Sequence, residues 1–412
     1  MAGTSNAVPL GQPQLAFVNF SKNSYITIEG NQNADRFFII RSGKVRISKQ
    51  VEVVKEEGGD ILGPGDFFAV VSTMSSHDHI ETAQALTDVT LISVQKEQYP
   101  QLILHNKAVA MKIILQFSKR MRYLDEALTR LTLKNNAESD PSHLFKIGEY
   151  YEGQKQYNQS YYAYQQYINY CPQGKEVPAV RERLMKIAPY ADSVKTDFAP
   201  DEFNRSYPAS SMIFAEGEKG DELYIIQKGS VKIAKIVDNN EMLLAVLRTG
   251  DIFGEMALLE AKPRAASAVA YNDCQVLVVN RANFEQMIAA QPQIIARLTT
   301  LLADRIWLIY KQLANTLLTE PLGRMYDALL MQLEKDRVSL QSAKSHLFDF
   351  GSKELVNMVG LSPWEGAPLL WKILSSGKIQ EINDRIFVTD VAEIIIQAEY
   401  YRKMERLTRK VK

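Results

Sequence analysis

Short apolar strands joined by glycine turns alternate with long helical patterns along this chain of 412 residues. One pattern occurs twice: an apolar strand, a glycine turn, an alternating strand, a Gly-Asp turn, a further strand and a long helix. The matching segments are 37–47 and 223–233, 63–68 and 248–253, 89–94 and 274–279, and about 96–134 and 281–317. This self-similarity predicts one compact β-rich module, present in two copies.

Between the two copies the apolar period becomes helical, over residues 142–172. The segment reads as two helices, with the small residue Gly148 where they approach each other, and it resembles a single tetratricopeptide repeat. Tyr167 replaces the alanine that is usual in that repeat. A third helix at about 176–190 is expected to cover the open face, because one repeat cannot bury its own surface. The tyrosines are expected to fill a core or, alternatively, to line a peptide-binding groove.

After residue 318 the chain changes to a smaller pattern of helices and strands. An apolar helix is expected at about 321–335. Residues 352–374 then read as helix, turn at Gly360 and helix, and residues 378–390 read as a β-hairpin. A helix–turn–helix followed by a hairpin is a winged-helix arrangement.

Composition excludes several classes of protein. The 48 Lys and Arg balance the 48 Asp and Glu, so no global charge draws the chain to nucleic acid or to an acidic membrane. No apolar run approaches the roughly 20 residues that span a bilayer, and residues 1–14 read as a short disordered lead. Cys171 and Cys274 lie in different expected domains, which fits free thiols in a reducing cytoplasm. With no nucleophile elbow, phosphate loop or metal-ligand cluster in the sequence, the chain is not expected to be an enzyme.

Candidate chemistry is concentrated at residues 250–268 of the second copy, GDIFGEMALLEAKPRAASA. Gly254 lets a ligand approach the backbone closely. Glu255 supplies a carboxylate that only accepts hydrogen bonds, which suits a sugar hydroxyl. Arg264 supplies a planar, charged fork that can hold two phosphate oxygens. A carboxylate and an arginine around one short helix predict a pocket for a ribose phosphate.

Small and polar residues follow this arginine: Ala265 and Ala266 leave backbone N–H groups unobstructed, and Ser267 adds a hydroxyl. With them, FGEMALL and PRAAS closely resemble the phosphate-binding cassette of cyclic-nucleotide-binding domains, found in regulatory subunits of cAMP-dependent protein kinase and in bacterial cAMP receptor transcription factors. The resemblance implies a nucleotide site made of Gly254, Glu255, Met256, Ala257, Arg264, Ala265, Ala266 and Ser267. It places Glu255 on the ribose 2′-OH, and Arg264 with the amide of Ala265 on the cyclic phosphate. A hydroxyl residue after the arginine favours cGMP in the family, so Ala265 indicates cAMP.

The resemblance continues through residues 281–332, which are similar to the dimerisation helix of the cAMP receptor transcription factors. In that family the helix touches the adenine base. Tyr310 falls at the base-contacting position and Trp307 lies about one turn earlier, so either ring could stack on adenine or fill a dimer seam. A homodimer through residues 294–317 is expected. The side chains at helical spacing on this seam are Leu298, Leu301, Leu302, Arg305 and Leu308.

The first copy has lost this chemistry. Residues 65–83 align with 250–268 without a gap, which sets Val70 against Glu255 and His79 against Arg264. The same alignment sets Ala69 against Gly254 and Glu81 against Ala266. Valine cannot accept a hydroxyl, and a glutamate would repel a phosphate. The first copy is therefore expected to be a structural or interaction domain, with a different ligand left open.

The output end resembles the winged helix of those transcription factors over 319–391. Its recognition helix departs from the family, with Pro363, Trp364 and Pro368 at the places of the base-reading side chains. Residues 319–401 hold 8 Lys and Arg against 12 Asp and Glu, a net charge of −4, and only the tail is basic. The output partner is expected to be either DNA or a protein.

The fold class expected is α+β, with two cyclic-nucleotide-binding β-barrels of jelly-roll type, a tetratricopeptide-like insert and a winged-helix-like end. The expected divisions are 1–14, 15–136, 137–192, 193–318 and 319–412. We expect a cytoplasmic cAMP-binding regulator that couples its second domain to transcription or to a protein partner. The alternative is a regulatory subunit that restrains an enzyme such as a protein kinase, although no Arg-Arg-x-Ser/Ala segment precedes the first domain.

Overall fold

The computed structural model describes residues 15–31, 34–49, 60–133, 142–191, 198–199, 202–237, 240–281, 283–284, 286, 292–340 and 342–411. The expected disordered lead at 1–14 lies outside these residues. Within them, no helix is both long and apolar enough to cross a membrane.

The first repeat is built from two four-stranded antiparallel sheets with strand orders β1-β8-β3-β6 and β2-β7-β4-β5. The strands are β1 (Ala16–Phe20), β2 (Tyr25–Thr27), β3 (Arg36–Ser42), β4 (Val45–Ser48), β5 (Ile61–Leu62), β6 (Phe67–Phe68), β7 (Thr82–Ala85) and β8 (Val89–Gln95). A short helix, α1 (Val70–Ser75), follows β6, and α2 (Tyr99–His105) leads to the long helix α3 (Lys107–Leu133).

The second repeat has the same layout, with strand orders β14-β11-β16-β9 and β10-β15-β12-β13. Its strands are β9 (Asn204–Tyr207), β10 (Met212–Phe214), β11 (Glu222–Lys228), β12 (Ser230–Val237), β13 (Asn240–Arg248), β14 (Ile252–Phe253), β15 (Ser267–Ala270) and β16 (Cys274–Asn280). The short helix α7 (Glu255–Glu260) follows β14, and the long helix α9 (Pro292–Thr316) closes the repeat. The prediction of two copies of one module is confirmed.

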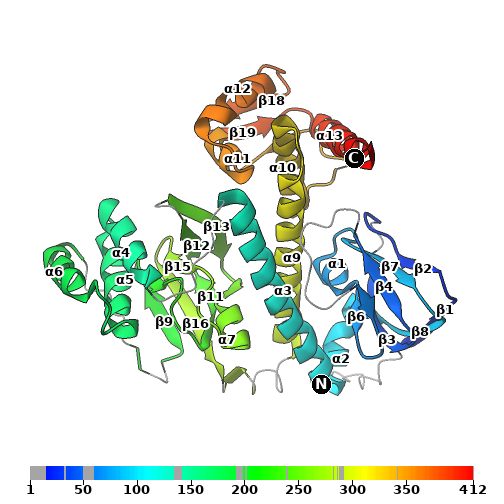
Figure 1. The fold of residues 1–412 in the computed structure, drawn as a ribbon, viewed down its shortest axis with the longest axis horizontal. Helices are drawn as coiled ribbons and strands as arrows, with labels where there is room; N and C mark the ends of the chain where they lie inside the picture. Colours follow the sequence, from blue (N-terminus) through cyan, green and yellow to red (C-terminus); the bar gives the residue numbers. More distant parts are fainter. Residues whose placement is uncertain are drawn as a thin grey trace, which may run out of the picture.

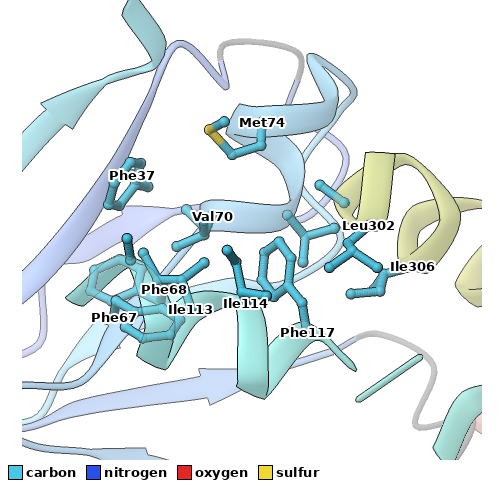
Figure 2. Packing of buried hydrophobic residues seen from close by; sticks show 14 of the residues in the cluster. Phe37, Phe67, Phe68, Val70, Met74, Ile113, Ile114, Phe117, Leu302 and Ile306 are labelled. Carbon is cyan, nitrogen blue, oxygen red and sulfur yellow. The ribbon is translucent and has the colours of Figure 1, made fainter. Parts of the chain in front are cut away.

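The two long helices, α3 and α9, lie side by side through the middle of the molecule, with one repeat on each side (Figure 1). Figure 2 shows the junction, where Ile114 and Phe117 of α3 lie beside Leu302 and Ile306 of α9. Phe117, Leu302 and Ile306 are each at most 3% exposed. Val70 of α1 lies in the same cluster, so the first repeat and both helices share one core.

This pairing changes the interpretation of the α9 seam. Of the five residues that predicted a homodimer, Leu298 and Leu302 are each 1% exposed within a single chain. The other three, Leu301, Arg305 and Leu308, are partly exposed. Helix α9 packs on α3, α2 and α1, which cover part of its apolar face. The homodimer expected through residues 294–317 stays a prediction, with two of its five seam residues already used inside the chain. A leucine pattern at helical spacing does not distinguish a second copy of the chain from a second repeat as the surface that α9 packs on.

Three helices follow the first repeat: α4 (His143–Gly153), α5 (Tyr157–Tyr170) and α6 (Val177–Ile187), which ends in the short 3₁₀ helix η2 (Ala188–Tyr190). A Cβ on Gly148 would lie 2.4 Å from the Tyr164 ring, so only glycine allows α4 and α5 this close approach. The buried tyrosines 151, 162, 164 and 167 fill a core shared with Met212 and Val269 of the second repeat. The helical segment thus covers its open surface against a neighbour.

The C-terminal part starts with α10 (Pro321–Lys335), continues through α11 (Ser352–Met358) and α12 (Pro363–Leu374), and ends in α13 (Val391–Val411). Strands β18 (Ile379–Ile382) and β19 (Arg385–Val388) form the predicted hairpin, and an unpredicted strand, β17 (His346–Leu347), pairs with β19. Asn315 near the end of α9 donates to the Asp327 carboxylate of α10 at 2.8 Å. The second repeat and the C-terminal part are therefore joined by hydrogen bonding as well as by the chain.

Candidate functional site

The candidate cassette follows β14. Gly254 caps α7 with a φ of 76°, in the left-handed region that favours glycine. A Cβ at this position would lie 2.8 Å from Nη1 of Arg264. Gly254 is therefore required both for the turn and for the space that Arg264 occupies.

Arg264 is buried, with 5% of its surface exposed. Its Nη1 donates to the backbone carbonyls of Glu222 at 2.7 Å and Gly254 at 2.8 Å, and its guanidinium lies 4.2 Å over the Phe214 ring. Its Nε is buried without a hydrogen-bond partner. A Cβ on Gly220 would lie 2.2 Å from this Nε. A buried charged donor with unused capacity is a group that an anionic ligand would satisfy.

Glu255, the first residue of α7, is 2% exposed. Its Oε1 accepts from Nη1 of Arg305 on α9 at 3.0 Å, and Nη2 of the same arginine donates to the carbonyl of Ile252 at 2.7 Å. The carboxylate expected to bind a sugar is thus held by the helix that leads to the C-terminal part.

A cavity of about 240 Å³ opens beside Arg264, between the second repeat and α3 of the first. Its lining residues are Arg122, Asp125, Glu126, Glu216, Gly217, Lys235, Lys262, Pro263, Arg264 and Ala265. The lining carries four basic and three acidic side chains, so it offers charged contacts of both signs to one small, polar ligand.

Two acidic groups near Arg264 have raised pKa values. Burial raises the pKa of Asp125 to about 6, against the opposing charges of Lys235 and Arg305. Burial also raises the pKa of Glu218 to about 7. The backbone N–H of Ala215 and the hydroxyl of Tyr162 nevertheless donate to Glu218 at 2.8 and 3.0 Å. Burial therefore disfavours the charged form of both carboxyl groups.

Four further predicted cassette residues, Met256, Ala257, Ala266 and Ser267, are buried. Met256, Ala257 and Ala266 are buried at 9%, 2% and 9% exposure. The Ser267 hydroxyl accepts from the backbone N–H of Glu216 at 2.9 Å, which fixes the turn that faces Arg264. Of the eight predicted cassette residues, Arg264 and Ala265 line the cavity directly.

Trp307 and Tyr310 lie elsewhere. The Trp307 ring stacks on His77 of the first repeat, 3.9 Å between centroids, and the Lys49 ammonium lies 5.2 Å from the Tyr310 ring. Neither ring lines the cavity beside Arg264. The structure therefore does not bring these two aromatic residues to the rest of the predicted site.

Sequence reasoning missed the residues that α3 brings to the cavity. The register that aligns 65–83 with 250–268 also aligns Arg122 with Trp307 and Asp125 with Tyr310. The available signal was that α3 carries two charged side chains at the positions where α9 carries two aromatic rings. The contact of α3 with the other repeat could not be read from it.

In the first repeat, the chain's own side chains occupy the region that corresponds to the cassette. Val70 is 2% exposed and packs in the core, so it offers no acceptor. The Glu81 carboxylate accepts from the backbone N–H of Ala69 at 3.2 Å and lies 3.6 Å from Arg120. His79, opposite Arg264 in the alignment, is 4% exposed.

Two eight-stranded repeats, each with a short helix inserted between strands and a long helix at its end, define a protein with paired cyclic nucleotide-binding domains. That domain family matches residues 17–106 and 204–291. The chain belongs to the family of cyclic nucleotide-binding regulators of the CRP type. It is 32% identical over 157 residues to a CRP-like cAMP-activated global transcriptional regulator of Mycobacterium tuberculosis, covering 38% of this chain and 70% of that protein.

A second relative is the cAMP-activated global transcriptional regulator CRP of Salmonella typhimurium, 31% identical over 158 residues, covering 38% of this chain and 75% of that protein. Among solved structures, Thermus thermophilus catabolite activator protein is 27% identical and covers 50% of this chain and 97% of its own, with a TM-score of 0.27. The cAMP-bound regulatory domain of Toxoplasma gondii PKA is 16% identical and covers 69% and 84%, with a TM-score of 0.21.

Proposed function

We propose that this protein is a cAMP-responsive regulator that binds one cyclic nucleotide per chain, in the second repeat. The observation that carries the proposal is Arg264, a buried guanidinium with an unused donor, on the wall of a polar cavity. A cyclic phosphate supplies the anionic oxygens that such a donor lacks.

The cassette residues divide the ligand between them. Arg264 and the amide of Ala265 take the phosphate, and Glu255 accepts from the ribose 2′-OH. Gly254 and Ala257 bring the backbone close to the sugar and phosphate, while Met256, Ala266 and Ser267 shape the surrounding wall. Ala265 leaves no hydroxyl next to the arginine, and for that reason cAMP is favoured over cGMP.

Titration calorimetry with cAMP and with cGMP tests the stoichiometry and the choice of base. One site per chain and tighter binding of cAMP are expected, because Val70 and Glu81 leave the first repeat without an acceptor for ribose or room for a phosphate. Two tight sites per chain would contradict the proposal, and so would no binding of either nucleotide.

The output is proposed to pass through a winged-helix-like domain at 319–412, with the tetratricopeptide-like helices at 137–192 as a support for the second repeat. Helix α12 exposes Trp364 at 90% and Trp371 at 73%. Its one basic residue is Lys372. Exposed aromatic rings with little positive charge favour a protein partner over DNA. A cytoplasmic setting suits Cys171 and Cys274, neither of which forms a disulfide.

A mobility-shift experiment with genomic fragments, with and without cAMP, separates the two outputs. Absence of a cAMP-dependent shift, together with cAMP-dependent capture of one defined protein that Trp364→Ala abolishes, is the expected result. A cAMP-dependent shift of specific fragments would instead make the output transcriptional and overturn the protein-docking assignment.

A further inference from the structure

The two central helices use equivalent arginines on their own repeats. Arg120 of α3 lies 3.6 Å from Glu81, and Arg305 of α9 lies 3.0 Å from Glu255. These arginines occupy the same position in the gap-free alignment of the repeats. Each helix is therefore anchored to the cassette region of its own repeat.

Two positions further along, each helix reaches the other repeat. Trp307 of α9 stacks on His77, in the turn that follows α1 of the first repeat. Arg122 of α3 donates from Nε to Glu260 at 3.0 Å and from Nη1 to the carbonyl of Pro263 at 3.2 Å. Ser118 of α3 donates to the same glutamate at 2.7 Å. The contact of α9 with the first repeat is therefore aromatic, and the contact of α3 with the second repeat is ionic.

The ionic contact falls on the nucleotide cassette itself. Glu260 ends α7, and Pro263 immediately precedes Arg264. The side chains of Arg122 and Glu260 are 11% and 2% exposed, so solvent screens this pair weakly. Arg122 thus ties both ends of the 260–263 turn to a helix that belongs to the first repeat.

We infer that the first repeat serves as a built-in partner of the nucleotide site, and that Arg122 is the positioning residue that holds the Pro263–Arg264 turn in its binding geometry. This inference rests on the proposed cAMP site in the second repeat. A turn held in place before the ligand arrives loses less conformational freedom on binding. A repeat without binding chemistry of its own then contributes to affinity through its helix.

The test compares Arg122→Gln with Arg120→Gln in the full chain. Both variants remove an arginine from a largely buried ion pair on the same helix, but Arg120 faces Glu81 of the first repeat. Arg122→Gln is expected to weaken cAMP binding by about tenfold or more, the scale of losing one buried charged contact. Arg120→Gln is expected to stay within about threefold, and Arg122→Lys to recover part of the loss.

Differential scanning fluorimetry separates positioning from folding. The melting temperature of each nucleotide-free variant reports stability, and the rise on adding cAMP reports binding. At the same cAMP concentration Arg122→Gln is expected to show a smaller rise than wild type, whereas Arg120→Gln keeps it. If Arg122→Gln does not fold, Glu260→Gln neutralises the Arg122–Glu260 ion pair from the other side, and a loss of cAMP affinity in the same direction is expected.

Equal cAMP affinity in wild type and in whichever of these two variants folds would overturn the role of Arg122 while leaving the proposed function intact. An equal loss in Arg120→Gln would also overturn it, because a general loosening of α3 would then be the cause. If the wild-type chain binds no cyclic nucleotide, the proposed function fails and the inference fails with it.

Discussion

The carboxylate of Glu81 accepts a hydrogen bond from the backbone N–H of Ala69 at 3.2 Å. Ala69 caps α1 with a φ of 64°, as Gly254 caps α7 with a φ of 76° in the second repeat. Ala266 stands where the first repeat has Glu81. The first repeat thus carries an internal anion in the cassette region, at the place where the second repeat is proposed to receive a phosphate. This carboxylate accounts for a non-glycine residue remaining in the left-handed conformation.

Replacing Glu81 by alanine is expected to lower the free energy of unfolding by about 1–3 kcal/mol, because the buried N–H of Ala69 loses its acceptor. Urea denaturation measures the change, with the exposed Glu97→Ala as a control expected to stay within about 0.5 kcal/mol. The variant should still bind one cyclic nucleotide per chain, because Val70 supplies no acceptor for ribose. If Glu81→Ala unfolds at the same urea concentration as wild type, the Glu81 carboxylate does not stabilise this repeat.

Arg264→Ala is expected to weaken cAMP binding by about 2–5 kcal/mol, the range for removing one partner of a buried charged contact. Arg264→Lys should recover little, because a lysine cannot reproduce the two-pronged geometry. Calorimetry measures both, and Arg183→Ala in the distant helical segment serves as a matched control. Binding by Arg264→Ala within threefold of wild type would place the phosphate elsewhere.

Leu302→Ala tests whether the central seam is formed within one chain. The side chain is 1% exposed in the core shared with α3. Its truncation is expected to cost about 2–5 kcal/mol of unfolding free energy, with no change in native mass by light scattering. The control Met185→Ala, at a side chain 78% exposed, should be neutral. A wild-type mass of two chains that halves in Leu302→Ala would support the homodimer through α9.

The sequence was sufficient for features that depend on local pattern. The duplicated strands and the hairpin after α12 follow from spacing and residue type, and the structure has both as predicted. The full set of cassette residues around Arg264 follows from the resemblance to cyclic-nucleotide-binding domains. The apolar period of α9 was equally clear. The surface that α9 packs on could not be predicted, because a stripe of leucines shows that a helix face is buried but not which surface covers it.

The wall that α3 contributes to the cavity is a contact between residues far apart in the chain. Arg122 and Asp125 read as ordinary polar positions on a helix, and only the packing of the two repeats brings them to Pro263 and Lys235. Trp307 shows the same limit from the other helix. Its place on α9 was predicted correctly, but its neighbour, His77, belongs to the other repeat and could not be predicted.

Glu218 predicts a pH dependence of stability. Its pKa is raised from 4.5 to about 7 in the folded chain, so the folded state favours the protonated carboxyl. Its contribution is full below about pH 4.5 and is lost as pH rises through about 7. Comparing unfolding free energies at pH 5 and pH 7.5, wild type should lose about 1–2 kcal/mol more than Glu218→Gln, with solvent screening included. The difference isolates Glu218 from Asp304, whose pKa is also raised, and from His77, whose pKa is lowered. Parallel profiles for the two proteins would contradict the assignment.

The fluorescence of Trp307 can test whether nucleotide binding changes the conformation of α9. In the double variant Trp364→Phe with Trp371→Phe, Trp307 is the remaining tryptophan of the chain, fully buried and stacked on His77. A ribose hydroxyl at Glu255 competes with Arg305 for the same carboxylate, and Arg305 and Trp307 share α9. Saturating cAMP is therefore expected to change the emission of this tryptophan, because a ligand shifts a conformational equilibrium through contacts that differ between its states.

Adding Arg305→Gln should abolish the change while calorimetry still detects binding. Unchanged emission at saturation, with binding confirmed, would show that α9 does not carry the signal.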